Sequence, residues 1–201
     1  MKRLQLTIAV LIFSVGVCFA QPFKGGVAAG LVGSQVDGDT YSGYDKLGGY
    51  VGFWVRLDLN ERSSLQTEIS YCGKGSHYIP PKDDPDPVYY LMRLDYIEMP
   101  FLYQYHFRNK FTVEAGPSIC YLLHSYEERN YMEISYGKFA FFNPAFIEGI
   151  SYQATEQLGI HLRFDNSLLS IRKDHVDAPR SRLFDNGQFN NCLMLFVSYK
   201  L

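Results

Sequence analysis

Residues 47 to 59 read LGGYVGFWVRLDL, and every odd-numbered position in this stretch is apolar or glycine. The even-numbered positions include Tyr50, Trp54, Arg56 and Asp58. Because successive side chains of a β-strand point to opposite faces, a period of two indicates a strand with one apolar and one polar face. The stretch therefore predicts a long β-strand and not a helix.

The same alternation recurs along the rest of the chain. Leu65, Thr67 and Ile69 alternate with Gln66 and Glu68, and the segments that follow repeat this arrangement. The pattern predicts eight strands, at about residues 22–33, 47–59, 64–75, 89–107, 111–124, 139–154, 158–170 and 189–200. The first is the least regular, because four glycines interrupt its alternation.

The connections between these strands alternate in length. Three are tight, at residues 60–63, 108–110 and 155–157, and four are long, at about 34–46, 76–88, 125–138 and 171–188. Short periplasmic turns alternating with long extracellular loops are typical of outer-membrane barrels. We therefore predict an all-β fold, an eight-stranded antiparallel up-and-down transmembrane β-barrel with both termini on the periplasmic side.

The start of the chain has the features of a secretory signal. Lys2 and Arg3 precede a mostly apolar stretch that runs from Leu4 to Val17, and Cys18 and Ala20 place small side chains at positions −3 and −1 before Gln21. We expect residues 1–20 to be a signal peptide and residues 21–201 to form one outer-membrane barrel domain. No later stretch is long enough for a spanning helix, so insertion into a membrane requires a closed barrel.

Composition excludes several classes of function. Removal of Lys2 and Arg3 from the 19 basic residues leaves 17, against 21 acidic ones, which is not the basic surface of a nucleic-acid-binding protein. Cys72, Cys120 and Cys192 would remain after cleavage, and their wide spacing fits neither a disulfide framework nor a metal site. We expect no cofactor, no metal and no nucleic-acid partner.

Alternation alone does not decide whether the polar face of the strands points into the lumen or outward. The polar face is predicted to carry Arg56, Glu68, Glu98, Glu114, Glu148, Arg163 and Asp165. In an outer-membrane barrel these would point into the lumen, while Phe53, Ile69 and Leu195 would face lipid. A soluble lipocalin-like binding barrel would have the opposite arrangement, and the Gly52-Phe53-Trp54 tripeptide resembles one found in lipocalins.

Several local patterns resemble the PorT-type outer-membrane barrel proteins of Bacteroidetes. The most specific runs from Tyr96 through Glu98 to Pro100, and others are Gly26–Gly30, Gln35–Asp39, Gly43–Gly48, Glu68–Tyr71, Lys74–Ser76 and Gly116-Pro117. The resemblance covers nearly the whole mature chain. It implies a barrel in the cell outer membrane, and a role as an accessory of type IX protein secretion or of envelope assembly.

The sequence contains one local cluster with the residue types of a hydrolase. His124 and Ser125 stand close to Glu127 and Glu128, a set that a lipid-modifying outer-membrane enzyme would need. Neighbouring residues of a strand point to opposite faces, so His124 and Ser125 are not expected to pair. We therefore predict a non-enzymatic, monomeric barrel without catalytic residues. Its expected partners are outer-membrane lipid and other envelope or secretion proteins, contacted through its loops or turns.

Overall fold

The computed structural model describes residues 23–107, 110–135, 137–173, 180–182 and 185–201. The predicted signal peptide therefore lies outside the described residues. The described part contains no helix of the length and apolarity needed to cross a membrane.

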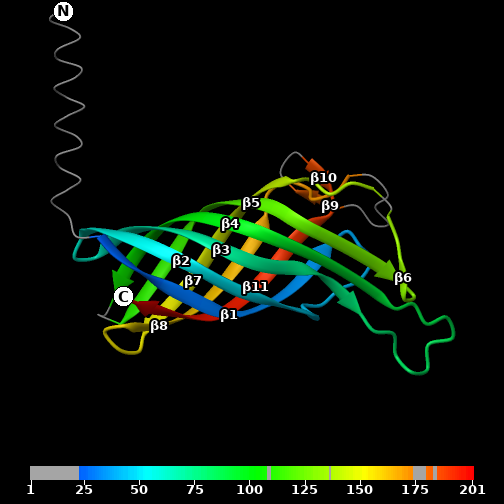
Figure 1. Ribbon diagram of the computed structural model, residues 1–201, viewed down its shortest axis with the longest axis horizontal. Coiled ribbons are helices and arrows are strands. Elements are labelled where there is room, and N and C mark those ends of the chain that lie inside the picture. The colour runs from blue at the N-terminus through cyan, green and yellow to red at the C-terminus, as the bar shows by residue number, and fades with distance from the viewer. Residues whose placement is uncertain (1–22, 108–109, 136, 174–179, 183–184) are drawn as a thin grey trace, which may run out of the picture.

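Eight antiparallel strands close into a barrel (Figure 1). In chain order they are β1 (Phe23–Asp37), β2 (Lys46–Asn60), β3 (Ser63–Tyr78), β4 (Tyr90–Phe107), β5 (Phe111–Arg129), β7 (Phe142–Gln153), β8 (Leu158–Ser167) and β11 (Phe189–Lys200). Each pairs with the next, and β1 pairs with β11 to close the cylinder. The predicted fold class is confirmed.

Three short strands lie in the long loops: β6 (Met132–Glu133), β9 (Arg180–Arg182) and β10 (Asp185–Gly187). Figure 1 places them at the end of the barrel opposite the C-terminus, while the start of β1 and the end of β11 share the other end. The tight turns are at the end that holds the termini. The predicted alternation of short periplasmic turns and long extracellular loops is therefore present in the structure.

The apolar face of the strands points outward. Phe53 is 68% exposed and Leu195 is 56% exposed, whereas Glu68 is 3% exposed and Arg163 is 1% exposed. A membrane barrel has apolar side chains outside and ionised side chains inside, whereas a soluble barrel has the reverse arrangement. The structure therefore favours the membrane alternative over the lipocalin-like one.

One strand has the opposite orientation to that predicted from its charge. Glu148 on β7 is exposed on the outer wall, while Ala145 and Ile147 are buried in the lumen. The cause lies in the neighbouring strand, where Arg163 stands opposite Gly149. A Cβ atom on Gly149 would lie 2.8 Å from Cγ of Arg163, so the inward positions of β7 must be small at this level. The prediction that Glu148 faces the lumen was wrong.

A bulge in β5 changes the orientation of His124, which the alternation of residues 111–124 predicts on the polar face with Thr112, Glu114 and Ser118. Asp95 of β4 pairs with His124, but the next residue, Tyr96, pairs with Leu122, so Leu123 is an extra residue on β5. A bulge of this kind shifts the alternation of the bulged strand. His124 consequently lies outside the barrel, with its side chain 65% exposed, and not on the polar inner face.

Candidate functional site

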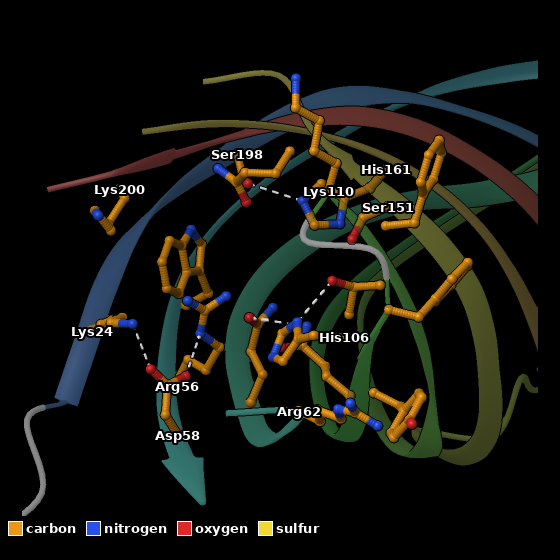
Figure 2. A pocket seen from close by; sticks show the side chains of 18 of the residues that line it. Lys24, Arg56, Asp58, Arg62, His106, Lys110, Ser151, His161, Ser198 and Lys200 are labelled. Carbon is orange, nitrogen blue, oxygen red and sulfur yellow. Dashed lines mark hydrogen bonds and ion pairs between the residues drawn. The ribbon is translucent and has the colours of Figure 1, made fainter. Parts of the chain in front are cut away.

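A polar cavity of about 1030 Å³ opens at the periplasmic end of the barrel (Figure 2). It is formed by the ends of the strands and by the tight turns. We call this cavity the periplasmic vestibule. Its charged lining residues are Lys24, Arg56, Asp58, Glu61, Arg62, Lys110, Glu156 and Lys200. Among the described residues, cations therefore outnumber carboxylates in its wall.

Two of these cations share one carboxylate. Asp58 accepts a hydrogen bond from the ammonium of Lys24, and it forms an ion pair with Arg56 at 3.0 Å from Nε to Oδ1. Trp54 lies beside them, donates its indole N–H to the carbonyl of Val27 at 3.3 Å, and has the guanidinium of Arg56 5.9 Å from its ring centroid. These contacts fix the β1–β2 side of the vestibule.

The other three vestibule cations have no ion pair to any described residue. Arg62 and Lys110 are exposed at tight turns, and Lys200 is half-buried at the end of β11. Figure 2 shows Arg62, Lys110 and Lys200 at separate points around the mouth. Because lysine and arginine are always charged at neutral pH, the mouth presents net positive charge to the periplasm.

Polar side chains close the inner end of the vestibule. The Gln104 amide donates to Gln66 at 3.2 Å and to Glu114 at 2.8 Å. His106 links Ser64 and Thr112, and His161 is 2.9 Å from the hydroxyl of Ser198. These side chains bond to one another and to neighbouring residues, although Nδ1 of His161 has no hydrogen-bond partner among the described residues, and we call them the floor of the vestibule.

Above the floor, three groups of buried ion pairs cross the lumen. In the first, Arg163 donates to Glu68 at 2.6 and 2.9 Å and to Glu114 at 2.5 Å. In the second, Lys74 donates to Asp165 and lies 3.4 Å from Glu98. In the third, near the extracellular end, Arg172 donates to both oxygens of Glu127, at 2.6 and 3.0 Å.

Apolar side chains fill the space around these pairs. Val36, Met92, Leu94, Tyr96 and Ile171 are buried together at the extracellular end, while Val32, Trp54, Met194 and Phe196 belong to a second cluster. An eight-stranded barrel has an interior just wide enough to be filled by side chains. The vestibule is therefore a cavity open at one end.

One carboxyl group above the lumen has an unusual environment. Asp39, in the loop after β1, is 2% exposed, and its Oδ2 has no hydrogen-bond partner among the described residues. Burial raises the pKa of this carboxyl from 3.8 to about 6, although hydrogen bonds from Ser76 and from the backbone N–H of Tyr41 oppose the shift.

The residues of the predicted hydrolase-like cluster are not brought together. His124 lies outside the barrel, with Nδ1 3.4 Å from Asp95 Oδ2, whereas Glu127 lies in the lumen with Arg172. Glu128 accepts a hydrogen bond from the hydroxyl of Tyr126. Among the described residues, Cys72, Cys120 and Cys192 are free and buried.

Sequence reasoning missed the vestibule. The available signal was the placement of Lys24, Arg62, Lys110 and Lys200 at strand ends and tight turns, since these ends converge on one mouth when the barrel closes.

Comparisons with known proteins agree with this architecture. A family model described as outer membrane protein beta-barrel domain matches residues 19–172. The structure of Ail, the attachment invasion locus protein of Yersinia pestis, in complex with the heparin analogue sucrose octasulfate, aligns with a TM-score of 0.51 and 11% identity, over 89% of this chain and 99% of that chain. Neisserial surface protein A aligns with a TM-score of 0.59 and 13% identity, over 88% and 97% of the two chains. Identities this low show a shared fold only. No curated protein matches the chain.

Proposed function

The chain belongs to the outer membrane protein beta-barrel domain family, and on that premise we propose that it is a non-enzymatic accessory of envelope assembly or of type IX protein secretion. The barrel lies in the cell outer membrane. The proposed role is to hold a periplasmic partner at the membrane and not to conduct a solute. The partner is a protein segment rich in Asp and Glu.

The observation that carries this proposal is the contrast between the two ends of the lumen. The periplasmic vestibule is open and positively charged, but Arg163, Lys74 and Arg172 and their carboxylate partners occupy the lumen above it. A cavity closed at its floor suits binding, and an excess of cations suits an acidic partner. The resemblance to PorT-type proteins supports the choice of secretion or envelope assembly.

A complementation experiment tests the role. In cells lacking the protein, wild type is compared with a variant in which the three unpaired vestibule cations are reversed, Arg62→Glu/Lys110→Glu/Lys200→Glu. The readouts are the release of type IX cargo and the amount of assembled outer-membrane protein. Wild type should restore both, and the vestibule variant should restore neither, because like charges now face the acidic partner.

The matched control reverses two exposed cations of the extracellular loops, Lys82→Glu/Lys138→Glu, and should behave as wild type. Both variants must first show the gel mobility of a folded barrel, which changes on boiling. Full restoration by a folded vestibule variant would contradict the proposed binding site. Normal secretion and assembly in cells that lack the protein would contradict the role itself.

A further inference from the structure

The ladder between β2 and β3 ends before either strand does. The last pair toward the extracellular side is Tyr50 with Cys72, although β2 continues to Lys46 and β3 continues to Tyr78. Beyond this pair the two strands stay in contact without pairing, since a Cβ on Gly48 would lie 2.0 Å from the carbonyl oxygen of Gly73, and the side chain of Lys46 lies beside both glycines. Its ammonium is 3.1 Å from the position that a Cβ on Gly48 would take, and 3.5 Å from that of a Cβ on Gly73.

Glycine is needed at position 48 because a Cβ there would overlap the carbonyl oxygen of Gly73. The same Gly73 position is 3.5 Å from the hydroxyl of Tyr71, a residue of the outer wall. The ammonium of Lys46 and the hydroxyl of Tyr71 are thus both 3.5 Å from the Cβ position of Gly73, which places the ammonium close to the outer wall.

The ammonium of Lys46 makes no hydrogen bond or ion pair to a described residue, although Lys46 is only 7% exposed. Two charged groups of β4, those of Asp95 and Arg93, interact electrostatically with the ammonium of Lys46. Burial of an unpaired charge is costly, so such a group is normally retained with a partner. The carboxylate of Asp95 acts on the ammonium without a direct bond, so an anion from outside the chain can still bind it.

Polar side chains surround this point on the outer wall. The hydroxyl of Tyr71 donates to Oδ1 of Asp95 at 2.6 Å, and Nδ1 of His124 lies 3.4 Å from Oδ2 of the same carboxylate. Both oxygens of the Asp95 carboxylate are therefore in contact with neighbouring side chains. Nε2 of His124 is not part of this contact. Arg93, the next outward-facing residue of β4, is exposed and has no ion pair to a described residue.

The depth of this cluster matches the level of lipid headgroups. Tyr71 and Tyr121 are exposed aromatic residues just past the middle of β3 and β5 toward the extracellular side, and aromatic girdles mark the membrane interface in such barrels. Asp95 and His124 follow directly beyond them in the register. We propose that Lys46, Arg93 and His124 form a binding site for the phosphate group of an outer-leaflet lipid.

Two unpaired cations of different kinds suit this ligand. Arginine presents a planar set of donors that matches phosphate oxygens, and lysine adds a point charge. The lipid's acyl chains would lie along the adjacent apolar wall, where Val51 and Ile69 are exposed. A free anion would gain the same charge contacts but not this apolar contact.

Native mass spectrometry of the intact barrel, released from detergent micelles, tests the site. The probes are a lipid A that carries its phosphates, the same lipid without phosphates, and inorganic phosphate. Wild type should retain the phosphorylated lipid. Lys46→Met and Arg93→Gln should each weaken retention roughly tenfold or more, as expected for loss of a charge-assisted hydrogen bond. Lys82→Met, in an exposed loop, should leave it unchanged.

Because Arg93 is exposed, Arg93→Gln should fold even if Lys46→Met does not. Equal retention of the dephosphorylated lipid would overturn the proposal, and so would competition by inorganic phosphate at the concentration of the lipid. Turnover of the lipid by wild type but not by His124→Gln would replace binding with catalysis. The site lies at the opposite end of the barrel from the vestibule, so this inference and the proposed function can fail separately.

Discussion

Replacement of Arg163 by methionine should destabilise the barrel more than any exposed substitution. The guanidinium makes three hydrogen bonds to Glu68 and Glu114, between 2.5 and 2.9 Å long, and all three side chains are nearly fully buried. Arg163→Met leaves two carboxylates in the lumen without their cation. Removal of one partner from a buried ion pair costs about 3–5 kcal/mol, and we expect a loss in the upper part of that range.

A triple variant separates the loss of charge balance from the loss of packing. In Glu68→Gln/Glu114→Gln/Arg163→Met no member of the triad is charged, and Met fills part of the space beside Phe196, whose ring centroid lies 4.7 Å from the guanidinium carbon of Arg163. Well-packed neutral replacements of buried ion pairs are often tolerated, so this variant should come within about 2 kcal/mol of wild type.

The assay is urea unfolding of the barrel refolded in lipid vesicles, with superimposable unfolding and refolding curves. Trp54 is the only tryptophan of the chain and is buried in a lumenal cluster, so its fluorescence reports on the fold. A loss below about 1 kcal/mol in Arg163→Met, or a triple variant no more stable than the single one, would refute the reasoning.

Further predictions concern the first loop, the lipid-facing wall and the lumen. The folded pKa of Asp39, about 6, is above its unfolded value of 3.8, so its contribution to loop packing is full below pH 3.8 and is lost as pH rises through 6. In Asp39→Asn the backbone amides of residues 38–44 should therefore exchange more slowly at pH 8 than in wild type, with an opening free energy larger by up to about 3 kcal/mol. Equal exchange rates in the two proteins would argue against the raised pKa. Glu148→Leu should stabilise the barrel in lipid by about 1–2 kcal/mol in the same urea assay, since an exposed carboxylate is costly there, whereas a destabilised variant would indicate that Glu148 has a partner. Wild type should fractionate with outer membranes, migrate faster on a gel unheated than boiled, and show no steady conductance in planar bilayers; a stable open channel would contradict the filled lumen.

The sequence predicted the fold because strand periodicity and turn length are local properties. The alternation at residues 47–59 and its repeats indicated the strands, and the alternation of short turns and long loops indicated an up-and-down barrel. The clean apolar set that includes Phe53 and Leu195 also indicated the face that meets lipid. Each of these features can be read from a few consecutive residues.

The sequence was misleading where neighbouring strands decide the outcome. The two faces of β7 are almost equally apolar, and Glu148 belongs to one of them. The bulk of Arg163 on β8 determined which face turned inward. The bulge at Leu123 placed His124 on the outer wall beside Asp95, a residue of another strand.

By itself, then, the sequence determined a cylinder of alternating strands and the side of most residues in it. Only the tertiary structure decided which side chains meet across the lumen, how the turns form the periplasmic vestibule, and that Lys46 lies beside Gly48 and Gly73. The physical reason is that closure and stagger of the strands bring together residues far apart in the chain, and a period of two carries no information about that stagger.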